Sequence, residues 1–181
     1  MSKRVVVIGV AGVLVVALVV GLYLFQPWRL VTDRTADEAL LVPAATTTTS
    51  AAATTSAAVT TTSAAPEGPV ALASGPFRSL EHATTGTATL VRLPGGGHAV
   101  QFEALDTSDG PDLYVYLSDK PADSSESAFG SGFTNLGELK ANRGNQVYEV
   151  PAGVDLTAVR SVVIWCKRFS AGFGAAPLEQ G

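Results

Sequence analysis

The chain has 181 residues, with 16 acidic and 12 basic side chains and a net charge of −4, which allows one ordinary domain with tails. The sequence has no basic stripe that could neutralise a phosphate backbone, so nucleic acid is not expected as a partner. The single cysteine excludes an internal disulfide and a zinc site built from several thiolates.

The first predicted element is a transmembrane helix over residues 5–25. The stretch VVVIGVAGVLVVALVVGLYLF carries no charge, and at roughly 1.5 Å per residue it covers about 30 Å, the thickness of a hydrocarbon core. Lys3 and Arg4 favour a cytoplasmic N-terminal tail over residues 1–4. We therefore expect a single-pass anchor in the cell membrane, with the C-terminal domain outside the cytoplasm. A cleaved signal is the alternative, although its apolar region usually spans only about 7–15 residues.

Residues 26–74 are expected to form a linker or stalk outside the cytoplasm. Within it, residues 44–66 read AATTTTSAAATTSAAVTTTSAAP and offer no hydrophobic face to bury, which predicts disorder. The composition is that of an O-glycosylated stalk, and a plain flexible spacer is the alternative. Random-coil dimensions give this stretch a span of roughly 25–30 Å, enough to hold a domain clear of the headgroups.

Short runs with an apolar/polar alternation predict an all-β domain over residues 75–181. The runs are TATLVRL (87–93), HAVQFEAL (98–105), DLYVYLS (112–118), NQVYEV (145–150) and SVVIWC (161–166). Turn signals lie at PGGG (94–97), SDGP (108–111), RGN (143–145) and PAG (151–153). Only a fragment near Leu136–Lys140 hints at a helical period. This pattern favours an antiparallel β-sandwich.

The run SVVIWCKRF contains the only cysteine. The pleat of a strand puts Cys166 on the same face as Val162 and Ile164, which points it inward. Trp165 then lies on the opposite face, at a sheet edge or under a neighbouring loop. If the strand continues, Arg168 returns to the face of Cys166, where a guanidinium would lower the pKa of the thiol.

Four blocks of the domain, taken in order, resemble one known family. They are HATTGTATLVRL, DTSDGPDLYVYLS, LGELKANRGNQVYEVP and SVVIWCKRFSAGFGAAPL. They are similar to the DM-thirteen domain of the Skeletor type, an electron-transfer domain, over roughly residues 75–178. The resemblance implies redox chemistry at the cell surface through Cys166, as a free thiol or as a ligand to a prosthetic group such as haem. Animal members often accompany a haem-binding DOMON domain, so a separate redox partner protein is implied here.

Two readings of Cys166 follow from the residues. A free cysteine is commonly a small hydrophobe in a core, in which case the domain is a non-catalytic module that binds an envelope ligand or protein. An unpaired thiol in an oxidising compartment is a liability unless it is shielded or used, which favours a redox role. Both readings remain open at this point. Hydrolase chemistry is not indicated, since no GxSxG signature is present.

The identity of a cofactor also remains open. His82 and His98 are the only histidines and would complete a copper-type set with Cys166. Copper is disfavoured because the stretch KRFSAGFGAAPL after Cys166 holds neither His nor Met. Haem is compatible with Cys166 or His82 as the axial ligand, although no CxxCH motif is present for covalent attachment. Trp165 would stack on such a cofactor or fill the core.

A third hypothesis concerns calcium. The stretch DTSDGPD spaces Asp106, Asp109 and Asp112 three residues apart around a Gly-Pro turn. Clustered carboxylates suit calcium, which would make this a calcium-stabilised structural domain. Asx-turns explain the same residues without a metal.

Overall fold

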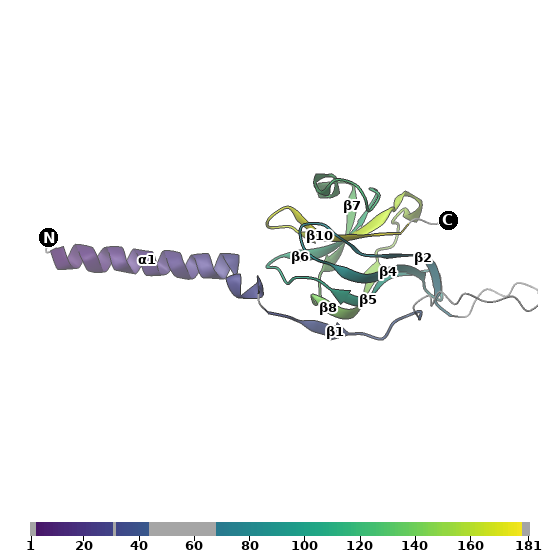
Figure 1. The fold of residues 1–181 in the computed structure, drawn as a ribbon, viewed down its shortest axis with the longest axis horizontal. Helices are drawn as coiled ribbons and strands as arrows, with labels where there is room; N and C mark the ends of the chain where they lie inside the picture. Colours follow the sequence, from purple (N-terminus) through teal and green to yellow (C-terminus); the bar gives the residue numbers. More distant parts are fainter. Residues whose placement is uncertain (1–2, 31, 44–67, 179–181) are drawn as a thin grey trace, which may run out of the picture.

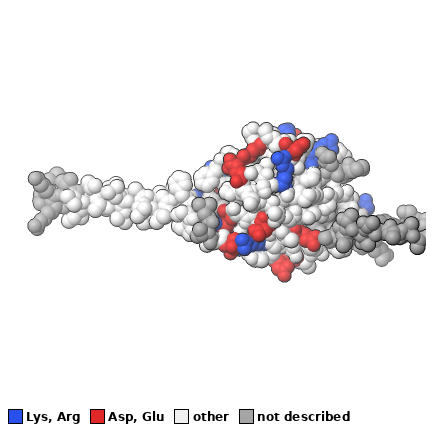
Figure 2. All heavy atoms as spheres, viewed as in Figure 1, with Lys and Arg blue, Asp and Glu red and all other residues white. Residues whose placement is uncertain are grey.

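The structure is a computed structural model that describes residues 3–30, 32–43 and 68–178. Helix α1 (Lys3–Phe25) projects away from a β domain, and the short 3-10 helix η1 (Pro27–Leu30) joins the two (Figure 1). The helix ends before Pro27, whose ring disfavours a helical conformation at Gln26. The apolar stretch Val7–Arg29 is long enough to cross a membrane, although a signal sequence meets the same test. The visible face of α1 beyond its grey first residues carries no charge (Figure 2).

The domain consists of two sheets of five strands each. The first contains, in spatial order, β1 (Thr35–Asp37), β8 (Arg143–Val150), β5 (His98–Asp106), β4 (Thr85–Arg92) and β2 (Val70–Pro76). The second contains β3 (Arg78–Ser79), β10 (Ala171–Pro177), β9 (Ser161–Cys166), β6 (Leu113–Ser118) and β7 (Phe133–Glu138). All pairs are antiparallel except β1 with β8. Two further 3-10 helices, η2 (Glu126–Gly130) and η3 (Leu156–Ala158), lie in the loops before β7 and β9. The all-β prediction is confirmed, and each of the five predicted runs forms a strand.

The core lies between the two sheets. It is built from every second residue of the strands, because the side chains of these residues point inward. Val100 and Phe102 contribute from β5, and Val115 and Leu117 contribute from β6, all of them buried. Phe77 meets Phe102 edge-on at 5.1 Å between ring centroids. Apolar side chains of this size each stabilise the fold by about 1.5–3 kcal/mol when fully buried, which explains why the alternation fixes the register.

Strand β9 confirms the predicted division of side chains between its two faces. Val162, Ile164 and Cys166 belong to the core between the sheets. Val163 and Trp165 belong to a second apolar cluster on the outer face. Because β9 lies in the middle of its sheet, it is not at an edge. The loop that carries η2 covers Trp165, with Phe129 in the same cluster.

Two local predictions were wrong. The Leu136–Lys140 fragment is not helical, because residues up to Glu138 form β7 and pair with β6. The RGN stretch predicted as a turn lies inside β8. Its Gly144 has a φ of 94°, a conformation that glycine adopts without strain, and it sits beside a register shift between β5 and β8. The glycine of the RGN stretch therefore marks a β-bulge within β8 and not a turn between strands.

Two stretches that the sequence analysis assigned to the linker lie in the first sheet. Residues Val70–Pro76 form β2 along one edge, and Thr35–Asp37 form β1 along the other. Alternating polarity could not indicate β1, since the strand is only three residues long. The Ala/Thr-rich residues 44–66, for which disorder and a stalk were predicted, lie outside the described residues.

Candidate functional site

Cys166 is the last residue of β9. It lies opposite Leu113 of β6 and Ala171 of β10. Its side chain has 0% exposure and packs in the core between the sheets. The sulfur is therefore sealed in this conformation.

The exposed turn between β9 and β10 lies directly beyond the sulfur. Lys167 to Ser170 are all exposed, with 53% of Phe169 accessible. The backbone N–H of Lys167 donates to the carbonyl of Asp112 at 3.0 Å, and Ser170 has a φ of 52°. Because the chain reverses here, only a four-residue turn separates the buried thiol from solvent at this end of the sheet.

The surroundings of Cys166 favour the neutral thiol. Burial raises the pKa of Cys166 above its usual range, and the backbone N–H groups of Phe169 and Arg168, which favour the thiolate, offset only part of that rise. The Arg168 guanidinium does lower this pKa, as predicted, but its charge is the smallest of the influences on the thiol and the net shift is upward. Strand β9 ends at Cys166, so Arg168 lies in the exposed turn and not on the strand.

Trp165 does not share the face of the sulfur. It is 5% exposed and packs with Tyr116 and Phe129 under the η2 loop. Tyr116 stacks on Phe133 at 3.9 Å and lies 6.2 Å from Tyr114. An aromatic cluster therefore runs from the residue next to Cys166 to the surface of the second sheet.

The two histidines lie at different places. His82 stacks on Phe173 at 3.9 Å between ring centroids, and Phe173 belongs to the same core cluster as Cys166. His98 begins β5 and pairs with Val150, so it lies at the end of the sandwich away from Cys166. The structure therefore does not bring the copper-type set of Cys166, His82 and His98 together, and among the described residues no three His, Cys, Asp or Glu side chains form a metal cluster.

Haem ligation by Cys166 does not fit the arrangement either. Cys166 lines neither the groove between Phe133 and Val154, nor the cavities next to Asp109 and Arg29, nor the one beside α1. A groove of about 500 Å³ lies at the opposite end of the sandwich, between Phe133 and Val154. A planar cofactor would need a space beside the sulfur that core side chains fill.

The three aspartates of the predicted calcium site have separate partners. Asp106 is exposed and pairs with Arg143 at 3.1 Å. Asp109 is buried, with a side-chain exposure of 1%, and accepts two hydrogen bonds from Arg34, at 2.9 and 3.3 Å. Asp112 uses its backbone carbonyl to accept from the turn after β9. The carboxylates therefore do not converge on one point in the structure.

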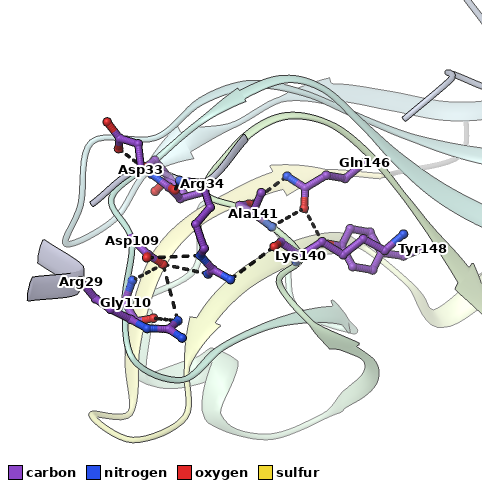
Figure 3. Close-up of polar contacts among 11 residues, drawn as sticks. Arg29, Asp33, Arg34, Asp109, Gly110, Lys140, Ala141, Gln146 and Tyr148 are labelled. Atoms are coloured by element: carbon purple, nitrogen blue, oxygen red, sulfur yellow. Dashed lines mark hydrogen bonds and ion pairs between the residues drawn. The ribbon is translucent and has the colours of Figure 1, made fainter. Parts of the chain in front are cut away.

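The contacts of Asp109 belong to a network that the sequence analysis missed. Arg29 donates to the carbonyl of Gly110 at 3.2 Å, and Arg34 donates to Asp109 and to the carbonyl of Lys140 (Figure 3). Asn142 accepts from the backbone of Arg34 at 2.7 Å and donates to Asp33 at 3.0 Å. The segment after α1 is thus joined to the loops next to Cys166.

The same segment continues along the outer face of the first sheet. Glu38 accepts two hydrogen bonds from Lys140, at 2.8 and 2.9 Å, which hold the pKa of its carboxyl below the usual range. The buried amide of Gln101 accepts from the backbone of Leu41 and Val42 and donates to the carbonyl of Val42 at 2.8 Å. We call residues 29–30 and 32–42 the strap. The sequence hinted at the strap only through the mixture of arginines and acids in WRLVTDRTADE. These residues follow neither a strand nor a helix period, so they predicted no element.

Comparison with known proteins identifies one family. Residues 76–178 match a family described as "Electron transfer DM13", within two residues of the stretch expected from the sequence. No curated protein and no solved structure matches the chain.

Proposed function

We propose, from the premise that the chain belongs to the electron-transfer DM13 family, that it is a membrane-anchored redox domain whose reactive group is the Cys166 thiol. Family membership supports a redox-related role for the domain. In this proposal α1 is a single-pass anchor, and the domain lies outside the cytoplasm and works with a separate protein. The observation that carries the assignment to Cys166 is its position at the end of β9, directly before the exposed turn Lys167–Ser170.

The proposed reaction is thiol–disulfide exchange. Opening of the turn Lys167–Ser170 admits water to the sulfur and removes the burial that keeps it protonated. The thiol releases its proton to water, and the thiolate attacks one sulfur of a partner's disulfide. A new bond joins Cys166 to that sulfur, and the second sulfur of the partner leaves as a thiolate. The domain has one cysteine, so a thiol of the partner must resolve the mixed disulfide.

The test uses the full chain in detergent micelles and an aromatic disulfide, dithiobis(nitrobenzoate), as the probe. Local opening predicts that one thiolate equivalent is released in the folded protein, at a rate unaffected by low urea. Cys166→Ala, which keeps the fold and removes the sulfur, should release none. A rate that rises with urea in parallel with global unfolding would contradict the proposal, because the thiol would then be exposed only in the unfolded chain.

A second function is a binding module in which Cys166 is a core residue. The specific observation in its favour is the complete burial of Cys166 in the hydrophobic core between the sheets. Its binding surface would be the groove between Phe133 and Val154 at the other end of the sandwich. The same probe distinguishes the two functions, since a binding module needs no native-state reactivity.

A further inference from the structure

The tether between α1 and the domain is short. α1 ends at Phe25, and the side chain of Arg29 already reaches the domain, donating to Gly110 and lying 3.9 Å from Asp109. Four residues span at most about 14 Å even when fully extended. The distance from the end of the helix to the loop 107–112 is therefore at most the length of these four residues plus the length of the Arg29 side chain.

The turn beyond Cys166 lies at the same end of the sandwich. Leu113, which follows the loop, pairs with Cys166, and Lys167 donates to the carbonyl of Asp112. In Figure 1 the yellow hairpin turn next to β10 points toward α1, whereas the C-terminus lies at the far side of the domain. The domain therefore presents the thiol end, and not the groove end, toward the helix.

The strap runs from this end along the first sheet, away from the helix. Beyond the Arg34–Asp109 pair it forms β1, and Val42 is bound by the Gln101 side chain. On the other side of the Ala/Thr-rich segment, Val70 pairs with Arg92. The described residues on either side of that segment, Val42 and Val70, both lie on the first sheet, so the segment does not set the distance between helix and domain.

We infer that the end of the sandwich formed by residues 107–112 and 167–170 rests on the headgroup layer of the bilayer that holds α1. This rests on the anchoring role proposed above for the helix. At about 1.5 Å per residue the helix fills a hydrocarbon core of about 30 Å, and the headgroup region adds only about 5–7 Å on each side. Arg29 falls in that region and brings the loop bonded to it to the same depth.

The side chains at this end suit a lipid surface. Lys167 and Arg168 are exposed cations, and the next residue in the turn, Phe169, is an exposed aromatic. Trp28, just past the helix, is 48% exposed at the depth where aromatic belts lie. Two exposed acids nearby, Asp33 and Asp106, are both paired with Arg143.

This orientation defines the partner of the thiol. When the turn opens, Cys166 is uncovered at the bilayer surface and not toward the bulk solvent. The disulfide that reacts with it must therefore belong to a membrane-resident protein, at headgroup depth. A soluble oxidant would have to approach between the domain and the lipid.

The test measures the depth of two spin labels in vesicles of phosphatidylcholine and phosphatidylglycerol. The full chain carries Cys166→Ala, with Phe169→Cys at the thiol end or Ala152→Cys in an exposed turn at the groove end as the matched control. Oxygen concentrates in lipid and a polar nickel chelate in water, so we expect a higher ratio of oxygen to nickel relaxation for the label at position 169 than for the label at position 152. Deleting residues 44–66 should leave both labels unchanged, whereas a Gly/Ser insertion after Gln26 should move the label at position 169 into water.

Equal nickel accessibility of the two labels, or movement of the label at position 169 on deletion of residues 44–66, would overturn the inference. Mass spectrometry of the membrane-bound protein separates this outcome from failure of the anchor, because removal of residues 1–25 would be seen directly. Reactivity of Cys166 with a disulfide probe is measured independently, so the orientation can fail while the redox role stands.

Discussion

Arg34 and Asp109 form a bidentate ion pair that joins the segment after the apolar helix to the loop beside Cys166. The guanidinium donates to both carboxylate oxygens, at 2.9 and 3.3 Å, and the carboxylate is 1% exposed. A planar guanidinium suits this arrangement because its N–H groups match the two oxygens of a carboxylate. The strap is thereby part of the folded domain and not a linker to it.

Arg34→Ala should therefore destabilise the domain. The Oδ1 atom of Asp109 would keep its bond from the Gly110 amide, but the buried Oδ2 atom would lose its bond from Arg34. A buried acceptor left without a partner costs about 1–3 kcal/mol. Chemical unfolding of the full chain in detergent micelles measures the change. Arg92→Ala, which removes an exposed arginine at the end of β4, is the control and should change the free energy of unfolding by less than about 0.5 kcal/mol. Equal effects of the two changes would mean that the pair contributes nothing.

Gly144 allows the parallel pairing of β1 with β8. A Cβ at this position would collide with the carbonyl oxygen of Ala36. Gly137 in β7 has a similar φ, 116° against 94°, but open space around it. Both Gly→Ala changes carry the backbone strain of a positive φ, about 1–3 kcal/mol. Only Gly144→Ala should also release β1, seen as faster hydrogen exchange at Glu38, whose amide donates to the carbonyl of Asn145. Unchanged exchange at this amide would show that β1 tolerates the side chain.

The pH dependence of stability should report the buried thiol. Burial raises the pKa of folded Cys166, whereas the unfolded thiol ionises near about 8.5. A raised folded pKa contributes stability that is complete below the unfolded pKa and is lost as pH rises toward the folded pKa. The free energy of unfolding of the wild type should therefore fall relative to Cys166→Ala above about pH 8.5. A difference that stays constant from pH 7 to 10 would mean that burial does not affect this thiol.

Calcium should leave the stability of the domain unchanged. Asp106 and Asp109 are held by different arginines, and the three aspartates of the DTSDGPD stretch do not form a common site. Thermal melts of the full chain with calcium and with a chelator measure this directly. A higher midpoint with calcium that Asp106→Asn abolishes would show that the carboxylates converge on the ion after all.

The sequence predicted the parts of the fold that depend on alternation. The β9 run SVVIWC has one face of Val162, Ile164 and Cys166, and a sheet buried on both sides keeps that division. Strand β10 was missed because AGFGAAP is rich in small residues with low strand propensity. Its backbone nevertheless pairs with β9. Its small residues fit their surroundings, since Thr84 leaves no room for a side chain at Gly174.

The role of Cys166 as the reactive group stays a prediction, and only the position of its side chain can be compared with the sequence. The pattern located Cys166 on an inward face, but it could not show that the strand ends there and leaves Arg168 in the exposed turn. The strap could not be predicted because its contacts are long-range hydrogen bonds, such as those of Gln101 with Val42. Such contacts leave no periodic pattern in the sequence.

The most direct test of the central claim is the redox state of Cys166 in the native membrane. Cells are quenched with an alkylating agent, and the full chain is isolated without reductant. A redox role predicts a fraction of the chain in a reducible, higher-mass mixed disulfide with a membrane protein, absent from Cys166→Ala and increased by an oxidising medium. Recovery of Cys166 wholly as the free thiol under oxidising and reducing conditions alike would contradict it.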